Sequence, residues 1–161
     1  MPDTPPSTLR VYRVGDGRFP LFDGRGAMLH GGRWNSPGHP VIYGSCSQAG
    51  AMLELLVHAS IGKLPRNTAM VTIDIPETLV VETLEPEALP GWGKLDNKIS
   101  CVFGDEWITN KRSAVLLVPS VVAPFDKNVV INTMHPEFSK IIASEHLPLI
   151  WDERLFPKKE I

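Results

Sequence analysis

Three residues that can bind or react with a ligand follow one another within residues 31–58. Arg33 follows two glycines, and glycines leave backbone N–H groups open to a closely approaching ligand. An arginine at such a turn can hold a phosphate through two parallel hydrogen bonds, but the same pattern fits a surface arginine stacked on Trp34. Tyr43 lies in an apolar run, where it is either a core residue or a stacking face for a flat ring.

Glu54 is the acidic residue of an otherwise apolar segment that we expect to be helical over about residues 48–61. Helical spacing places Ser47, Glu54 and His58 on one narrow stripe, whereas the other faces of the segment are apolar. This stripe either faces solvent or lines a pocket. In a pocket, the carboxylate would suit proton transfer or the stabilisation of a developing positive charge. Together with the arginine and the tyrosine, it indicates a site for an anionic ligand that carries a ring.

The segments around this stretch predict a sheet of short strands. Alternating or continuous apolar runs indicate strands over residues 9–14, 40–45, 68–75, 79–84, 113–119, 129–132 and 147–151. We expect the strand over 79–84 to lie beside the one over 68–75, and residues 27–34 to be extended. Further helices are expected near residues 105–110 and 135–142. Several short strands with one long helix indicate an α+β fold.

Composition limits the class of protein. The 161 residues fit one domain, and a hydrophobic fraction of 43% allows a core to be buried. We expect a disordered N-terminus over residues 1–8, one domain over residues 9–156 and a tail over residues 157–161. A net charge of −2 excludes the basic surface of a nucleic-acid-binding protein. There is neither a membrane-spanning apolar run nor a secretory signal, so we expect a cytoplasmic protein with no membrane contact.

Common metal and nucleotide motifs are missing from the sequence. Cys46 and Cys101 are far apart and form no CxxC pair, so no metal site is expected. Neither a GxxxxGK[ST] nor a GxGxxG pattern occurs, which excludes a P-loop and a dinucleotide-binding fingerprint. Ser113 opens an apolar strand but lies in no GxSxG elbow, which argues against a hydrolase nucleophile.

Six blocks in order resemble the RES-domain family and cover roughly residues 9–150. They are YR at residues 12–13, GGRWNSPGHPVIYGS, AMLELLVH, GDEW, SAVLLVPS and INTMHPEF. The family takes its name from an arginine, a glutamate and a serine, which match Arg33, Glu54 and Ser113. The block AMLELLVH departs from the shorter lead-in of many members, but the departure does not affect the glutamate.

The resemblance implies a fold, a substrate and a partner. RES proteins are toxins of bacterial type II toxin–antitoxin pairs, and their antitoxins carry an Xre-type helix-turn-helix domain. The implied fold is a single α+β domain with a mixed or antiparallel β core and few helices, similar to diphtheria-type ADP-ribosyltransferase toxins. NAD would be the substrate, with no other cofactor, and the protein would contact DNA only through the antitoxin.

The resemblance also implies roles for the candidate residues. Arg33 would bind the pyrophosphate of NAD and take part in catalysis, and Tyr43 would face the nicotinamide. Glu54 would stabilise the positive charge that develops on the ribose as the nicotinamide leaves. Ser113 would lie near the nicotinamide or Glu54. Weaker candidates for lining the site are Arg13 and Asn132.

Three hypotheses for function remain open on the sequence. The favoured one is a toxin that degrades NAD by glycohydrolysis or phosphorolysis. The first alternative is an ADP-ribosyltransferase that modifies a cellular protein. The second alternative is a non-catalytic partner of the antitoxin, although the presence of an arginine, a tyrosine and a glutamate in one stretch counts against it.

Overall fold

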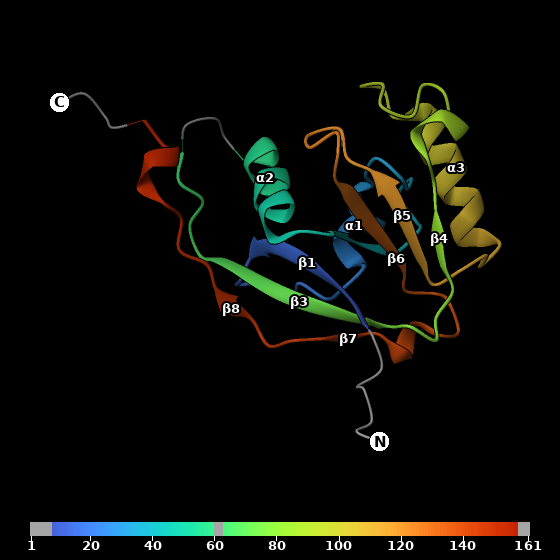
Figure 1. The fold of residues 1–161 in the computed structure, drawn as a ribbon, viewed down its shortest axis with the longest axis horizontal. Helices are drawn as coiled ribbons and strands as arrows, with labels where there is room; N and C mark the ends of the chain where they lie inside the picture. The colour runs from blue at the N-terminus through green and yellow to red at the C-terminus, as the bar shows by residue number, and fades with distance from the viewer. Residues whose placement is uncertain (1–7, 60–62, 158–161) are drawn as a thin grey trace, which may run out of the picture.

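An eight-stranded mixed sheet with three α-helices makes up the part of the chain that the computed structural model describes, residues 8–59 and 63–157 (Figure 1). The strands are β1 (Thr8–Asp16), β2 (Val41–Ser45), β3 (Thr68–Pro76), β4 (Val81–Thr83), β5 (Val115–Pro119), β6 (Lys127–Asn132), β7 (Ile142–Ala143) and β8 (Leu147–Pro148). The helices are α1 (Arg25–His30), α2 (Gln48–His58) and α3 (Lys98–Thr109), and short 3₁₀ turns lie at Pro86–Ala88, Phe138–Lys140 and Glu153–Leu155. The expected α+β domain with few helices is confirmed.

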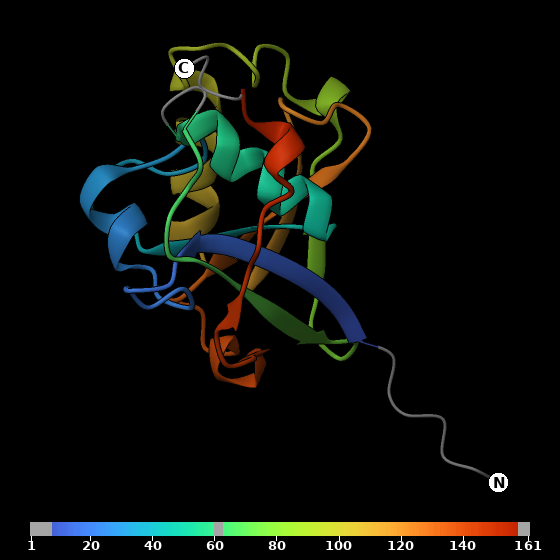
Figure 2. The same ribbon diagram turned by 90° about the vertical axis from the view of Figure 1, so that its left-hand side faces the viewer.

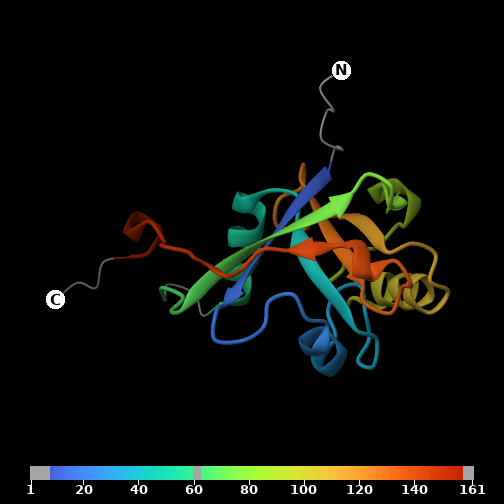
Figure 3. The ribbon, with the colours of Figure 1, turned by 90° about the horizontal axis from the view of Figure 1, so that it is seen from below.

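The sheet has the strand order β4-β5-β6-β2-β1-β3-β7, and β8 also pairs with β3. Every pairing is antiparallel except that of β4 with β5, which α3 connects as a parallel crossover. The expectation that residues 79–84 lie beside β3 is therefore wrong. This segment forms β4 at the other end of the strand order, where it pairs with β5. Seen from below, the chain that contains β7 and β8 follows β3 (Figure 3).

Alternation along the strands divides the core between the two faces of the sheet. Val129 and Ile131 of β6 belong to one apolar cluster, together with buried residues of β1 and β3. Val130 lies on the other face, in a second cluster that includes the fully buried Trp107 of α3. α2 packs on β1 and β2, whereas α3 lies toward the β4 edge (Figures 1 and 2). The candidate residues can therefore be assigned to a face by their position along each strand.

Three local expectations differ from the structure. Residues 25–30 form α1 rather than an extended segment, and Gly31 ends this helix at φ 69°, a conformation that glycine adopts without strain. Only Phe138–Lys140 forms a 3₁₀ turn within the helix expected over 135–142, and the strand expected over 147–151 is reduced to β8. α3 begins at Lys98 and is longer than expected.

Some expectations fall partly on residues outside the described ranges. The expected end of the α2 helix at residues 61–62 lies outside them, and within them α2 ends at His58. Of the expected N-terminal and C-terminal tails, only Thr8, which begins β1, and residue 157 are described. None of the described helices is both long and apolar enough to cross a membrane.

Candidate active site

Glu54 is held by two residues that are far from it in the sequence. Its Oε1 accepts a hydrogen bond of 2.7 Å from Nδ2 of Asn128 on β6 and one of 3.1 Å from Oγ of Ser120. The carboxylate is half-buried, and within the described part of the chain Oε2 accepts no hydrogen bond. The two donors fix one oxygen and leave the other available to a ligand.

The N-terminus of α2 is tied to the same end of the sheet. Ser47 caps the helix by accepting from the backbone N–H of Gly50 at 2.9 Å, and its hydroxyl donates to Asp126 at 2.6 Å. A Cβ on Gly50 would lie 2.8 Å from the Asp126 carboxylate, so only glycine lets the helix approach this loop so closely. Both ends of the 120–126 loop are thus bonded to α2, through Ser120 and through Asp126.

Tyr43 uses its hydroxyl to hold the loop that carries Arg33. The hydroxyl donates to Oδ1 of Asn35 at 2.6 Å and accepts from the backbone N–H of Trp34 at 3.0 Å. Burial raises the pKa of this phenol well above its usual range, so the hydroxyl stays protonated. Gly32 lies against the ring, because a Cβ there would be 2.8 Å from the hydroxyl oxygen. Strand alternation places Tyr43 on the same face of the sheet as Ser45, which lies two residues further along β2. The Ser45 hydroxyl bonds Asn128 on the neighbouring strand.

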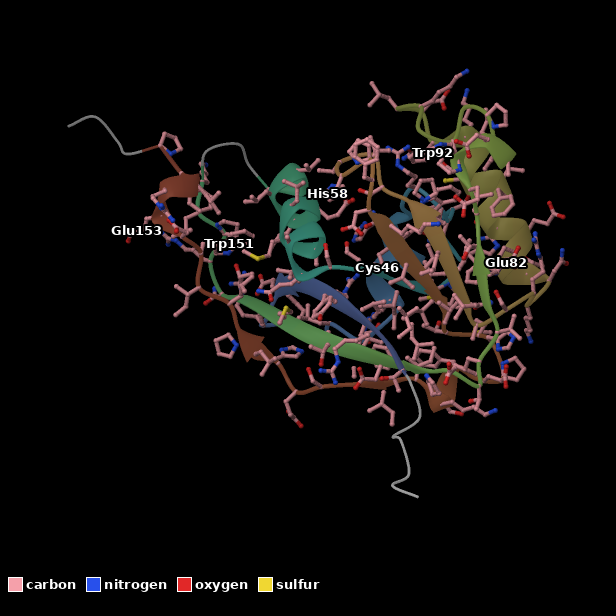
Figure 4. The ribbon with its side chains drawn as sticks, in the orientation of Figure 1. Cys46, His58, Glu82, Trp92, Trp151 and Glu153 are labelled. Atoms are coloured by element: carbon pink, nitrogen blue, oxygen red, sulfur yellow. The ribbon has the colours of Figure 1, made fainter. Side chains whose placement is uncertain are left out.

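Arg33 is oriented by backbone carbonyls rather than by an acid. Its Nη1 donates to the carbonyls of Trp92 at 3.3 Å and Lys94 at 3.0 Å. Among the described residues, no carboxylate lies within ion-pairing distance of this guanidinium. Trp92 is labelled in Figure 4, high in the view between α2 and α3. The charge of Arg33 is therefore positioned but not neutralised, which suits the binding of an anion.

α3 holds this loop from the other side. Asp105 accepts from the backbone N–H of Ser36 at 2.8 Å and from its hydroxyl at 2.5 Å. Gly104 packs so tightly that a Cβ would lie 1.7 Å from the carbonyl oxygen of Trp34. The indole of Trp34 in turn stacks on Trp92 with ring centroids 6.1 Å apart. The GDEW block thus fixes the arginine loop through packing and backbone hydrogen bonds.

Arg13 contacts the site through the main chain. Its Nη1 donates to the carbonyl of Tyr43 at 2.8 Å, while its Nε is buried with no hydrogen-bond partner among the described residues. Burial lowers the pKa of this guanidinium, although an arginine remains charged at neutral pH. The structure therefore places Arg13 against β2 at Tyr43, and its role in ligand binding stays a prediction.

Comparison with known proteins decides the family. The model of the RES domain matches residues 10–152. The chain belongs to the RES domain family. A toxin named Prs ADP-ribosylating toxin from Sphingobium sp. (strain YBL2) is 37% identical over 153 residues, which cover 92% of each chain. Toxin Res from Photorhabdus laumondii is 35% identical over 155 residues, 93% of this chain and 99% of the relative.

A solved structure shares the fold of this RES domain. The crystal structure of the M. tuberculosis MbcT–MbcA toxin–antitoxin complex contains a chain that superposes with a TM-score of 0.71. The match covers 89% of this chain and 85% of the other at 21% sequence identity. At that identity the likeness establishes the architecture of the RES domain and nothing of its chemistry.

Two predicted site residues of the RES domain lie away from Glu54. Ser113 precedes β5, whereas Ser120 follows it, so the two serines lie at opposite ends of that strand. The Ser113 hydroxyl accepts from the indole N–H of Trp107 at 2.9 Å and donates to the Val115 carbonyl at 2.9 Å. The Ser113 hydroxyl is also 3.5 Å from the carboxylate of Glu82. Figure 4 shows Glu82 beside α3, far from His58 on α2. Ser120, and not Ser113, donates to Glu54, whereas the expectation that Ser113 lies near the nicotinamide stays a prediction.

Asn132 likewise anchors α3 instead of lining the site. Its Nδ2 donates to the carbonyl of Ile108 at 3.1 Å, and its Oδ1 accepts from the N–H of Met134 at 3.0 Å. The side chain is fully buried. Sequence reasoning missed Ser120 and Asn128, although the last serine of the SAVLLVPS block and the predicted strand at residues 129–132 indicated where to look.

Proposed function

We propose that this protein is the toxin of a bacterial toxin–antitoxin pair and that it cleaves the bond between nicotinamide and ribose in NAD. The observation that carries the proposal is the half-buried carboxylate of Glu54, whose Oε1 accepts from two donors and whose Oε2 accepts from none of the described residues. It lies over the same sheet face as Tyr43, whose hydroxyl orients the loop with the unneutralised Arg33. This set provides an anion, an aromatic ring and a cation for the three parts of NAD.

The chemistry follows from how charge changes as the bond breaks. The ribose becomes cationic when nicotinamide leaves, and a fixed carboxylate lowers the energy of that cation without having to reorganise. Glu54 would take this role and orient the attacking nucleophile through Oε2. Arg33 would bind the pyrophosphate, and Tyr43 would lie against the nicotinamide.

The acceptor of the ADP-ribose is proposed to be water or phosphate. The main alternative is transfer to a protein, which the name of the Sphingobium relative, Prs ADP-ribosylating toxin, favours. NAD labelled in the adenylate would be incubated with the purified protein in buffer, in phosphate and with a cell lysate. Free ADP-ribose or its phosphate ester supports degradation, and a labelled protein band supports transfer.

Replacing Glu54 with glutamine tests the proposal. Glutamine keeps the shape but removes the charge, so nicotinamide release should fall by at least roughly 100-fold. The matched control is Glu85→Gln, which removes an exposed carboxylate paired with Lys127 and should leave the rate unchanged. Absence of NAD loss from the unsubstituted protein in buffer, phosphate and lysate would refute the proposed function.

We also propose that the partner is an antitoxin with an Xre-type helix-turn-helix domain. The solved structure with the same fold belongs to a toxin–antitoxin complex, and the net charge of −2 suits DNA contact only through a partner. Expression with the neighbouring helix-turn-helix gene should yield a stable complex with reduced NAD consumption. The non-catalytic alternative requires that toxicity in cells survive Glu54→Gln.

A further inference from the structure

Asn128 links the strand pair under the site to the Glu54 carboxylate. It lies on β6 directly opposite Ser45 of β2 in the register of the sheet. The buried hydroxyl of Ser45 donates to Oδ1 of Asn128 at 2.9 Å, and Nδ2 of Asn128 donates to Oε1 of Glu54 at 2.7 Å. The three side chains form one directed chain of hydrogen bonds.

This chain determines which way the Asn128 amide faces. The Ser45 hydroxyl can either donate or accept, whereas a carboxylate oxygen only accepts, so contact with Glu54 requires the amide to present its N–H there and its Oδ1 to Ser45. The opposite orientation would place the amide oxygen against a carboxylate oxygen, where two acceptors repel. The arrangement therefore keeps Nδ2 of Asn128 on the Glu54 carboxylate.

The second donor acts on the same carboxylate oxygen. The Ser120 hydroxyl donates to Oε1, and its own oxygen accepts from the backbone N–H of Ala123 at 3.0 Å. With its proton directed at Glu54 and its oxygen already an acceptor, Ser120 is a fixed donor rather than a nucleophile. Both donors thus converge on Oε1 and leave Oε2 unbonded within the described residues.

We infer that Asn128, itself bonded to Ser45, is a positioning residue that holds Oε1 of Glu54 so that Oε2 faces the reacting ribose. The statement about the ribose rests on the proposed function, whereas the control of the carboxylate by Asn128 does not. Asn128 acts through Glu54 and makes no contact with NAD in this scheme.

Other ionisable groups lie on the elements that carry Glu54 and its donors. They are His58 on α2, Asp126 at the end of the 120–126 loop and Lys127 on β6. Asp126 accepts from Ser47, and Lys127 pairs with Glu85. All of them stay in place in variants at residues 45 and 128, so a change in the titration of Glu54 between variants reports the loss of Asn128.

The decisive measurement is the titration of the Glu54 carboxyl carbon by ¹³C NMR, with the signal assigned by its loss in Glu54→Gln. Asn128→Asp places a second carboxyl group at hydrogen-bond distance, so the titration midpoint should rise by more than about one pH unit. Asn128→Ala removes one donor and should raise the midpoint by a smaller amount. Ser45→Ala frees the amide to rotate and should raise it less again, while keeping Asn128 in place.

The rate of NAD consumption gives the second readout. Asn128→Ala should lower kcat by roughly tenfold or more and change KM for NAD by less than about threefold, because a misplaced carboxylate affects the transition state more than substrate binding. In Asn128→Asp, kcat should recover as the pH falls and one proton is shared by the pair.

The possible results separate this inference from the proposed function. Midpoints within about 0.3 pH unit of the unsubstituted protein in all three variants would overturn the positioning role, whatever the enzyme does with NAD. If the midpoints move as expected and no form of the protein consumes NAD, the control of Glu54 by Asn128 stands and the NAD chemistry falls. Ser45→Ala, which leaves Asn128 unchanged, keeps the test valid if a change at position 128 prevents folding.

Discussion

Gly104 offers a sharp test of how the site is assembled. It lies in α3, where the helix backbone touches the carbonyl oxygen of Trp34, the residue after Arg33. Alanine is ordinarily the better residue in a helix, by roughly 1 kcal/mol. At this position the added methyl carbon would lie 1.7 Å from the Trp34 oxygen, and the nearest neighbours are all backbone atoms that cannot rotate away.

The size of the effect can be worked from this geometry. Real Cβ atoms essentially never approach a neighbour more closely than 3.0 Å, so helix and loop must separate by about 1.3 Å, the difference from 1.7 Å. Overpacking of this kind costs about 3 kcal/mol at the upper end of its usual range. After subtraction of the helix-propensity gain, Gly104→Ala should lower the free energy of unfolding by about 2 kcal/mol.

A second glycine provides the matched control. Gly26 also lies in a helix, α1, and a Cβ there would meet nothing within 4 Å. Gly26→Ala should therefore stabilise the protein, by roughly 0.5–1 kcal/mol. Urea denaturation of the two variants and the unsubstituted protein should give shifts of opposite sign. A Gly104→Ala protein as stable as the unsubstituted one would refute the view that α3 fixes the arginine loop by direct backbone contact.

Two further predictions concern hydroxyl groups. Ser120→Ala should lower the rate of NAD consumption roughly tenfold through loss of a donor to Glu54. Ser113→Ala should keep that rate but lower the free energy of unfolding by about 1–2 kcal/mol, because the Trp107 indole loses its acceptor. A rate that falls in Ser113→Ala and not in Ser120→Ala would restore Ser113 to the site. Burial raises the pKa of Tyr43, so its contribution to stability is complete below about pH 10, the unfolded value, and declines at higher pH, where the unfolded chain ionises first. Tyr43→Phe should be less stable at pH 8 by roughly 2 kcal/mol, and this deficit should shrink when urea titrations are repeated at pH 10.5; a deficit that is constant with pH would contradict the buried, protonated phenol.

The parts of the site that were predictable from sequence are those that lie close together in the chain. Tyr43 and Glu54 belong to a strand and to the helix that follows it, so their spacing alone puts both at one end of the sheet. The strand predictions rested on apolar alternation and were confirmed for β1, β2, β3, β5 and β6. The segment at residues 79–84 was misplaced because consecutive strands usually neighbour each other, whereas β3 and β4 lie apart in the sheet and β4 pairs with β5.

The partners of Glu54 depend on strand register, which one sequence does not reveal. Ser113 and Ser120 both border the same apolar strand, and only the pairing of β5 with β6 and of β6 with β2 shows which end meets α2. A hairpin between β5 and β6 was implicit in the two apolar runs. Only the pairing of β6 with β2 then puts the 120–126 loop, and hence Ser120, beside the C-terminal end of β2, where α2 begins.

The double attachment of the 120–126 loop also matters for how this protein can be altered. Ser120 bonds Glu54 of α2 and Asp126 bonds its N-cap Ser47, so both ends of the five-residue segment between them are anchored to the helix. The chain after Ala123, whose N–H holds the Ser120 hydroxyl, can change in length with little effect on the carboxylate, since lengthening a loop costs little once its ends are anchored. Relatives should therefore tolerate insertions at residues 124–125, and a fluorescent or affinity tag placed there should leave the rate of NAD consumption unchanged.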